Sequence, residues 1–226
     1  MGFGDAAQAF CGIVRVSGKT AMVAQRISIF PLTGVILFPG LQVPLHIFEP
    51  RYRSLVSDAM ARDRQIGLIQ PRGPGEPPAL FDMGCVGRIV DVEALDDGRY
   101  NLVLEGFARF RVLRELDVTT PFRQIEAELL TENEDEQVLS SIERASLERE
   151  SQRFANAQGY SVDWDSVARL DDRSLVNGIA QIAPFDAAAK QALLEAEGLT
   201  VRADLLVQLM QFFGRRDSDD PQVTLQ

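Results

Sequence analysis

A run of twenty-two residues without Asp, Glu, Lys or Arg, residues 27–48, constrains the fold of this chain more than any other feature. It is as long as the roughly 20 apolar residues that cross a bilayer as a helix. Pro31, Pro39 and Pro44 interrupt it, and each removes a backbone donor and clashes with the preceding helical turn. We therefore predict short buried strands, at 27–29, 35–38 and 43–48, instead of a membrane span.

The hydrophobic period changes directly after this run. Glu49-Pro50 opens a predicted helix, because proline is favoured at the first helical position, where its missing N–H is not needed. Apolar residues then recur at helical spacing and form one stripe: Tyr52, Leu55, Val56, Ala59, Met60. The chain is thus expected to pack one amphipathic helix beside its first strands.

Further strands are predicted at 65–70, 84–94, 99–105, 107–116 and 122–130, with a proline-rich loop at 71–78. The strands at 84–94 and 99–105 form a hairpin around Asp96-Asp97-Gly98. Six or seven short strands with one helix inserted early favour a small closed or nearly closed barrel.

From residue 131 the pattern is helical. A long helix is expected from about 138 to Gly159, a second over 174–183, a third from its cap Asp186 to Gly198, and a fourth from its cap Thr200 to Gly214. Residues 1–25 are predicted to be a flexible extension and 215–226 a disordered tail. Gly18-Lys19-Thr20 matches only the end of a phosphate-binding loop, since Ile13 stands where that loop needs glycine.

The net charge of −10 lies almost entirely in the second half of the chain. Residues 1–125 hold 14 basic and 13 acidic residues, whereas residues 126–226 hold 9 and 20. Such an acidic protein is a poor general binder of nucleic acid. Cys11 and Cys85 form no paired motif, which favours a reduced, cytoplasmic compartment, and no secretory signal is predicted.

Catalytic and metal-binding patterns are missing from the sequence. His46 is the single histidine, and with two remote cysteines it cannot build a zinc site; we expect it to bond Glu49 or a backbone carbonyl at the strand-to-helix corner. No GxSxG motif is present, and neither Lys19 nor Lys190 stands beside a serine-bearing motif. We predict no catalytic residue, no cofactor and no metal.

Several segments resemble, in order, the amino-terminal or substrate-binding domain family of Lon proteases. They are Phe30-Pro31-Leu32, Leu37-Phe38-Pro39-Gly40, Pro44 to Tyr52, the helix with Asp58, and then 84–92, 106–112 and 190–195. The resemblance covers residues 26–213. It implies a PUA-like β pseudo-barrel followed by a carboxyl-terminal helical bundle, an α+β fold, without the ATPase and Ser–Lys peptidase parts of those proteases. The matched residues that we expect to serve the fold are Pro31, Phe38, Pro39, Gly40, Pro44, His46, Glu49, Pro50, Arg51, Tyr52.

We accordingly predict a barrel subdomain over 26–130 and a helical subdomain over 131–214. The resemblance implies non-catalytic recognition of unfolded or extended polypeptide, as an adaptor or regulator in protein quality control, together with a protease or chaperone. Phe154, Tyr160 and Trp164 are the candidate polypeptide contacts, because together they would form an apolar surface.

Two other classes of function stay open at this stage. Arg109 and Arg111, beside Phe107 and Phe110, give an alternative: an RNA-binding PUA-like module with stacking aromatic residues. An uncharacterised enzyme is a third hypothesis, for which the sequence offers no constellation of residues. A steep salt dependence of binding would favour RNA, and salt tolerance with an apolar preference would favour polypeptide.

Overall fold

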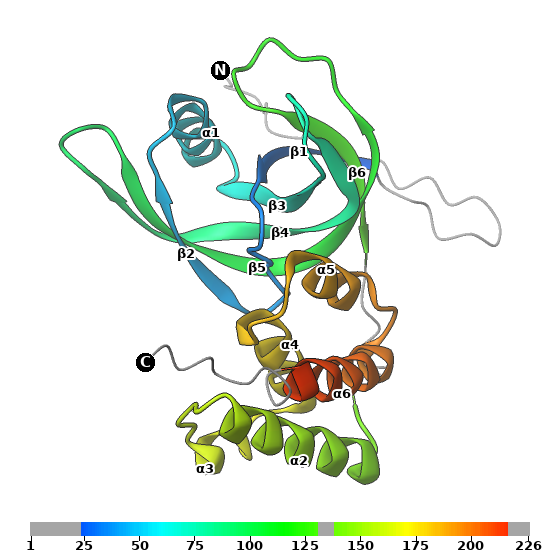
Figure 1. The fold of residues 1–226 in the computed structure, drawn as a ribbon. Coiled ribbons are helices and arrows are strands. Elements are labelled where there is room, and N and C mark those ends of the chain that lie inside the picture. The colour runs from blue at the N-terminus through cyan, green and yellow to red at the C-terminus, as the bar shows by residue number, and fades with distance from the viewer. Residues whose placement is uncertain (1–23, 131–137, 217–226) are drawn as a thin grey trace, which may run out of the picture.

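The computed structural model of the protein describes residues 24–130 and 138–216, and Figure 1 shows a curved sheet beside a group of helices. The first part of the chain forms β1 (Ala24–Pro31), β2 (Gln42–Ile47), α1 (Pro50–Ala61), β3 (Gln65–Arg72), β4 (Ala79–Ala94), β5 (Tyr100–Glu115) and β6 (Gln124–Leu130). The second part forms α2 (Ser141–Ala157), α3 (Trp164–Val167), α4 (Asp172–Ile182), α5 (Ala187–Glu195) and α6 (Leu199–Arg216). The predicted α+β class is confirmed.

The sheet closes on itself because β5 pairs with three other strands. β2 lies antiparallel to the first half of β5 and β6 to its second half, while β4 pairs along both halves. β6 also pairs with β1, and β1 lies parallel to β3, so the order β5-β4-β3-β1-β6 returns to β5. This closure makes the predicted pseudo-barrel and leaves β2 at an edge.

Strand boundaries differ from the prediction in three places. The segments 99–105 and 107–116 are one continuous strand, β5, although Gly106 breaks the apolar alternation. Strand β4 begins at Ala79 instead of residue 84, and β3 continues to Arg72, where a bulge next to Pro71 interrupts its register with β4. The proline-rich connection is therefore shorter than the sequence indicated.

The prediction of a strand at 35–38 is wrong. This segment is irregular, between Gly34 and Gly40, which both have positive φ angles. The Ile36 and Phe38 side chains enter the core of the helices, whereas the Leu37 side chain enters the core of the barrel. The segment is apolar because its side chains are divided between two separate cores. They are buried although the segment pairs with none of the described strands.

Helix α1 forms as predicted and covers one end of the barrel (Figure 1). Pro50 occupies its first position, and its buried residues are Tyr52, Leu55, Val56 and Ala59. The Tyr52 ring packs 4.3 Å from that of Phe30 in β1, centroid to centroid. Burial raises the pKa of Tyr52, the largest of several influences on that hydroxyl.

Helices α2, α4 and α5 each begin directly after a residue whose side chain caps the helix. Ser140 and Glu143 form a capping box at α2, and Asp186 caps α5 as predicted. Helix α4 begins at Asp172, earlier than expected, because Asp171 accepts a hydrogen bond from the Ser174 amide. The short helix α3 was not predicted. Thr200 lies inside α6 instead of capping it, and α6 runs past Gly214 to Arg216.

Two buried arginines bind carbonyl groups at the end of α5, and one of them, Arg109, connects the barrel to the helices. The Arg109 guanidinium, from β5, donates to the carbonyl oxygens of Leu194 and Ala196, both at 2.8 Å. Arg202, from α6, donates to the Leu193 carbonyl at 2.9 Å. Carbonyl groups at a helix end carry partial negative charge and lack helical partners, so cations there are stabilising.

None of the helices in the described ranges is long and apolar enough to cross a membrane. The uncharged run 27–48 is instead divided between β1, an irregular segment and β2. Proline and glycine therefore decide its structure, as the sequence predicted.

Candidate functional site

An apolar groove lies on the helical part of the molecule, with a volume of about 460 Å³. That volume falls in the range of pockets that hold small ligands or side chains. Its walls come from α2, α3, α4, the connections around them and one residue of α6: Ser151, Phe154, Ala155, Tyr160, Ser161, Val162, Trp164, Val167, Leu170, Leu175, Gly178, Ile179, Ile182, Ala183, Pro184, Met210. The groove thus combines segments that are up to about 60 residues apart in the sequence.

The structure brings the three candidate polypeptide contacts together in this groove. Tyr160 is half exposed and Trp164 is partly buried at the start of α3. Phe154 differs from the prediction, because only 6% of its surface is exposed and its ring packs against Phe185 at 5.9 Å. It supports the wall of the groove and offers little surface for a direct contact.

Three exposed aliphatic side chains of the groove were not predicted from the sequence. Ile182 is 80% exposed, and Val162 and Leu170 are also exposed, although all three are large aliphatic residues. Ile182 follows the buried Leu175 by seven residues and so shares its face of α4. It lies in the last turn of α4, where the chain turns away at Pro184 and leaves its side chain uncovered. Gathered apolar side chains of this kind mark interaction sites more often than scattered ones do.

The matched family residues lie outside the groove. Phe38 is fully buried in the helical core, and the Pro39 carbonyl accepts a hydrogen bond from Asn177 at 3.4 Å. Gly40 donates its backbone N–H to Gly106 at 2.8 Å. Pro31 ends β1, and Pro44 lies in the edge strand β2. Phe38 and Pro39 thus contact the helices, and Gly40 pairs with the barrel strand β5.

At the start of α1, Glu49 is the N-cap residue, but its side chain makes no capping hydrogen bond. It pairs instead with Arg51 at 2.8 Å, and the Arg51 guanidinium lies 4.6 Å from the ring centroid of Tyr52. The Arg51 guanidinium thus lies between an exposed carboxylate and a buried aromatic ring at the start of α1.

His46 was expected to bond Glu49 or a backbone carbonyl, and the structure gives it other partners. Its Nδ1 lies 2.7 Å from Oδ1 of Asn101, and its Nε2 lies 3.2 Å from the guanidinium of Arg99. A shallow cavity of about 330 Å³ beside it is also lined by Asp91 and Glu93. No group of three or more potential metal ligands occurs in the described parts of the chain.

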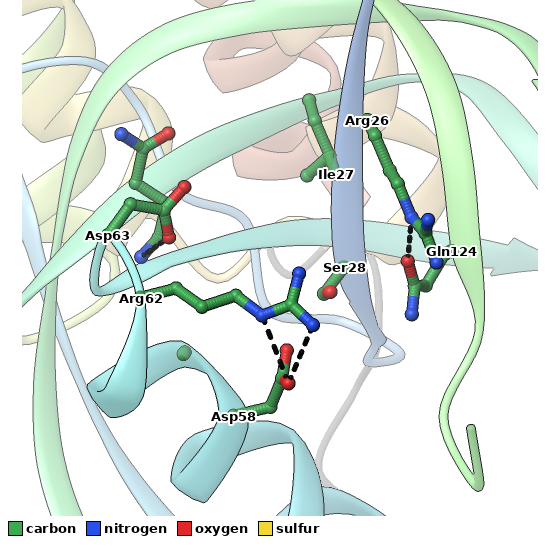
Figure 2. Close-up of a pocket in the computed structure, with 9 residues that line it drawn as sticks. Arg26, Ile27, Ser28, Asp58, Arg62, Asp63 and Gln124 are labelled. Carbon is green, nitrogen blue, oxygen red and sulfur yellow. Dashed lines mark hydrogen bonds and ion pairs between the residues drawn. The ribbon is translucent and has the colours of Figure 1, made fainter. Parts of the chain in front are cut away.

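A third, smaller cavity of about 130 Å³ lies between α1 and strands β1 and β6 (Figure 2). Its walls are polar. Arg62 pairs with Asp58 at 3.1 Å, and Arg26 donates to the side chain of Gln124. The cavity is small, and these groups already satisfy one another, so it offers a ligand few free contacts.

The arginines of the alternative RNA-binding strand are not equivalent. Arg109 is 6% exposed and held by carbonyls of the helical part, so its prediction as an RNA contact is contradicted by its burial. Arg111 is about half exposed and lies 3.9 Å from Glu128. Phe110 is fully buried, and only Phe107 of the two aromatic residues reaches solvent. The strand therefore presents no paired platform of arginine and stacked aromatic side chains.

The closed sheet with its edge strand β2, the helices beside it and the apolar groove define an α+β domain. The sequence matches the ATP-dependent protease La (LON) substrate-binding domain over residues 26–211. The chain belongs to that family, and the matched domain is a substrate-binding, non-catalytic one.

Related proteins agree with this assignment. The chain is 30% identical to Lon protease 1 of Syntrophobacter fumaroxidans over 185 residues, which are 79% of this chain and 23% of that protein. It is 36% identical to Lon protease 2 of Myxococcus xanthus over 104 residues, 44% of this chain and 12% of that protein. The chain therefore spans about a quarter or less of these relatives.

Two solved structures share the fold. A Lon N-terminal domain protein from Xanthomonas campestris superposes with a TM-score of 0.62 and 23% identity, covering 81% of this chain and 98% of that one. The N-terminal domain of the Mycobacterium avium complex Lon protease gives a TM-score of 0.64 at 19% identity, covering 83% and 98%. At these identities the likeness supports the fold alone, and the binding face has to be argued from this chain's own residues.

Proposed function

We propose that this chain binds unfolded or extended polypeptide, without catalysis, through the apolar groove between α2, α3 and α4. The observation that carries the proposal is the uncovered apolar lining of the groove, with Ile182 80% exposed and Tyr160 half exposed. Burying such side chains against an apolar partner is favourable by about 25 cal/mol per Å². Membership of a substrate-binding family supports a polypeptide as that partner.

As a polypeptide binder the chain would act as an adaptor or regulator in protein quality control, in the cytoplasm, and would deliver or withhold substrates of a protease or chaperone. The contacts are few and apolar, so binding at one groove is weak. Such binding suits recognition of unfolded chains, which expose apolar residues.

The test is fluorescence anisotropy of a labelled, permanently unfolded protein titrated with the chain at low and high salt. Two isoleucines provide a matched pair of variants, because Ile182 in the groove and Ile142 on α2 are 80% and 82% exposed. Ile182→Ser is expected to weaken binding about tenfold, the effect of losing one well-buried aliphatic contact. Ile142→Ser should bind as the unchanged protein does.

RNA as a competitor separates the two classes of partner. Saturable binding that resists salt and is not displaced by RNA supports the proposal. The absence of binding to the unfolded chain, with tight and salt-sensitive binding to RNA, overturns it. Equal loss of affinity in the two isoleucine variants would keep polypeptide recognition but reject the groove as its site.

A further inference from the structure

One glycine of the groove is not required by the packing of the chain itself. Gly178 lies in the interior of α4, where glycine is less favourable than alanine. A Cβ atom added there would meet no atom within 4 Å, and the residue has no positive φ angle that would demand glycine. By contrast, a Cβ atom on Gly84 or Gly106 would lie 2.4 Å from atoms of the protein.

The missing side chain leaves a notch in the wall of the groove. Leu175, Gly178, Ile179 and Ile182 are spaced at i, i+3, i+4 and i+7, so they share one face of α4, and all four line the groove. Any larger residue at 178 would project into the space between Leu175 and Ile182. The notch therefore lies between the buried Leu175 and the exposed Ile182.

Charged residues next to the groove are mainly acidic. Asp163 and Asp165 flank Trp164, and Asp171 follows Leu170, whereas Arg169 is the one basic residue directly beside an exposed lining residue in the described ranges. A hydrogen bond from the Ser166 side chain is the main reason that the pKa of Asp163 lies below its usual range. The Ser174 amide lowers the pKa of Asp171 in the same way. The edge of the groove at Trp164 and Leu170 is therefore negative on balance, with three carboxylates against Arg169, whereas at Ile182 the ammonium of Lys190 donates to the neighbouring Gln181 carbonyl.

From these observations, and resting on the proposed function, we propose that the groove selects polypeptide segments in which a large apolar side chain, inserted over Gly178, is flanked by Lys or Arg. The negative edge attracts the flanking cations, and the notch accepts the apolar side chain. The end of the chain itself does not match, because residues 217–226 carry three Asp and no Lys or Arg. The proposed ligand is a segment of another polypeptide, which membership of a substrate-binding family supports.

The experiment uses the full chain and three fluorescein-labelled peptides of one length. The first has a central Leu flanked by Lys, the second the same Leu flanked by Glu, and the third a central Ser flanked by Lys. We expect the first peptide to bind about tenfold more tightly than the third. It should bind two- to fivefold more tightly than the second, roughly the effect of surface charge pairs, and that difference should shrink at high salt.

Gly178→Leu fills the notch, and it should weaken binding of the first peptide about tenfold. Ala145→Leu adds the same side chain at an exposed position of α2 outside the groove, and it should leave affinity unchanged. Thermal unfolding verifies that both variants fold. Because the comparison of peptides needs only the unchanged protein, it tests the inference even if Gly178→Leu does not fold.

The outcomes separate this inference from the function on which it rests. Equal affinity for the three peptides, or a folded Gly178→Leu variant that binds the first peptide normally, overturns the selectivity. If Ile182→Ser still loses binding to unfolded protein, the groove stays the polypeptide site and only the role of Gly178 falls. If the unchanged chain binds no polypeptide at all, both proposals fail together.

Discussion

The guanidinium of Arg202 lies 5.2 Å from the ring centroid of Phe38, and both side chains are almost fully buried. Phe38 belongs to the irregular segment before β2, and Arg202 belongs to α6. The same guanidinium donates to Oδ1 of Asn177 at 2.8 Å and to the carbonyl of Leu193. One cation therefore holds an aromatic residue from the amino-terminal part against three helices of the carboxyl-terminal part.

Arg202→Met keeps most of the side-chain volume but leaves buried oxygen atoms without their donor. Because an unsatisfied buried acceptor costs about 1–3 kcal/mol, we expect the free energy of unfolding to fall by about 3 kcal/mol or more. Denaturation with urea measures it. Arg72→Met is the control, since Arg72 and its partner Asp82 are both more than half exposed and the loss of their ion pair should leave stability nearly unchanged. Similar values for both variants would contradict the role given to Arg202.

Two glycines should respond to alanine with opposite signs. Gly178→Ala is expected to raise the free energy of unfolding by about 0.5–1 kcal/mol, because it improves a helix without a clash. Gly106→Ala should lower it by about 2 kcal/mol, since the new Cβ would lie 2.4 Å from the carbonyl oxygen of Phe38. Chemical denaturation of both variants measures the two changes. A stabilised Gly106→Ala variant would show that the segment before β2 moves freely from the barrel.

Arg109 and Arg111 differ by two residues in one strand but should differ greatly in effect. Arg109→Met removes the donor to two carbonyls at the end of α5 and is expected to lower the melting temperature by about 4–8 °C. Arg111→Met removes only a half-exposed contact to Glu128, worth about 0.5 kcal/mol or less. Calorimetry distinguishes them. The hypothesis of an RNA-binding strand predicts the reverse, a loss of RNA affinity in both variants with little loss of stability.

The ion pair between Arg123 and Glu115 predicts a pH dependence. Two hydrogen bonds of 2.6 Å join them, and those bonds are the main reason that the pKa of Glu115 lies below its usual range. A carboxyl whose folded-state pKa is lowered stabilises the protein above its unfolded-state pKa, and this stabilisation is lost as pH falls through the folded-state pKa.

Glu115→Gln should therefore lower the free energy of unfolding at pH 7, by about 0.5–1 kcal/mol after allowance for solvent screening of a side chain that is 44% exposed. The difference between the two proteins should disappear as pH falls well below 4.5. Urea denaturation at several pH values measures it. A difference that persisted at low pH would mean that Glu115 acts through packing instead of charge.

Local features of the sequence predicted some of the helix termini. Pro50 begins α1 and Asp186 caps α5 as expected, whereas Thr200 does not cap α6. Such residues act through hydrogen bonds and backbone angles within four residues. They can therefore be recognised in a single sequence. Asp171 was missed although it obeys the same rule, because the apolar stripe that follows it was used to set the start of α4.

Only some residues of the candidate site could be predicted from the sequence. Phe154, Tyr160 and Trp164 were grouped as aromatic residues near one another in sequence, and they do line one groove. Ile182 and Gly178 were not found, because a helical pattern shows which residues share a face but not whether another element covers that face. The exposure of Ile182 depends on the path of the chain after Pro184.

The sequence by itself determined the class of the fold, the family, the early helix and the division of the uncharged run by proline and glycine, since each rests on local backbone chemistry or on motifs in order. Only the tertiary structure decided which residues the irregular segment and Arg109 contact and which residues form the groove. The Phe38 amide meets Gln181 across 143 residues, and Arg109 meets Leu194 across 85. Contacts at such separations arise from how whole elements pack, and no local pattern specifies them.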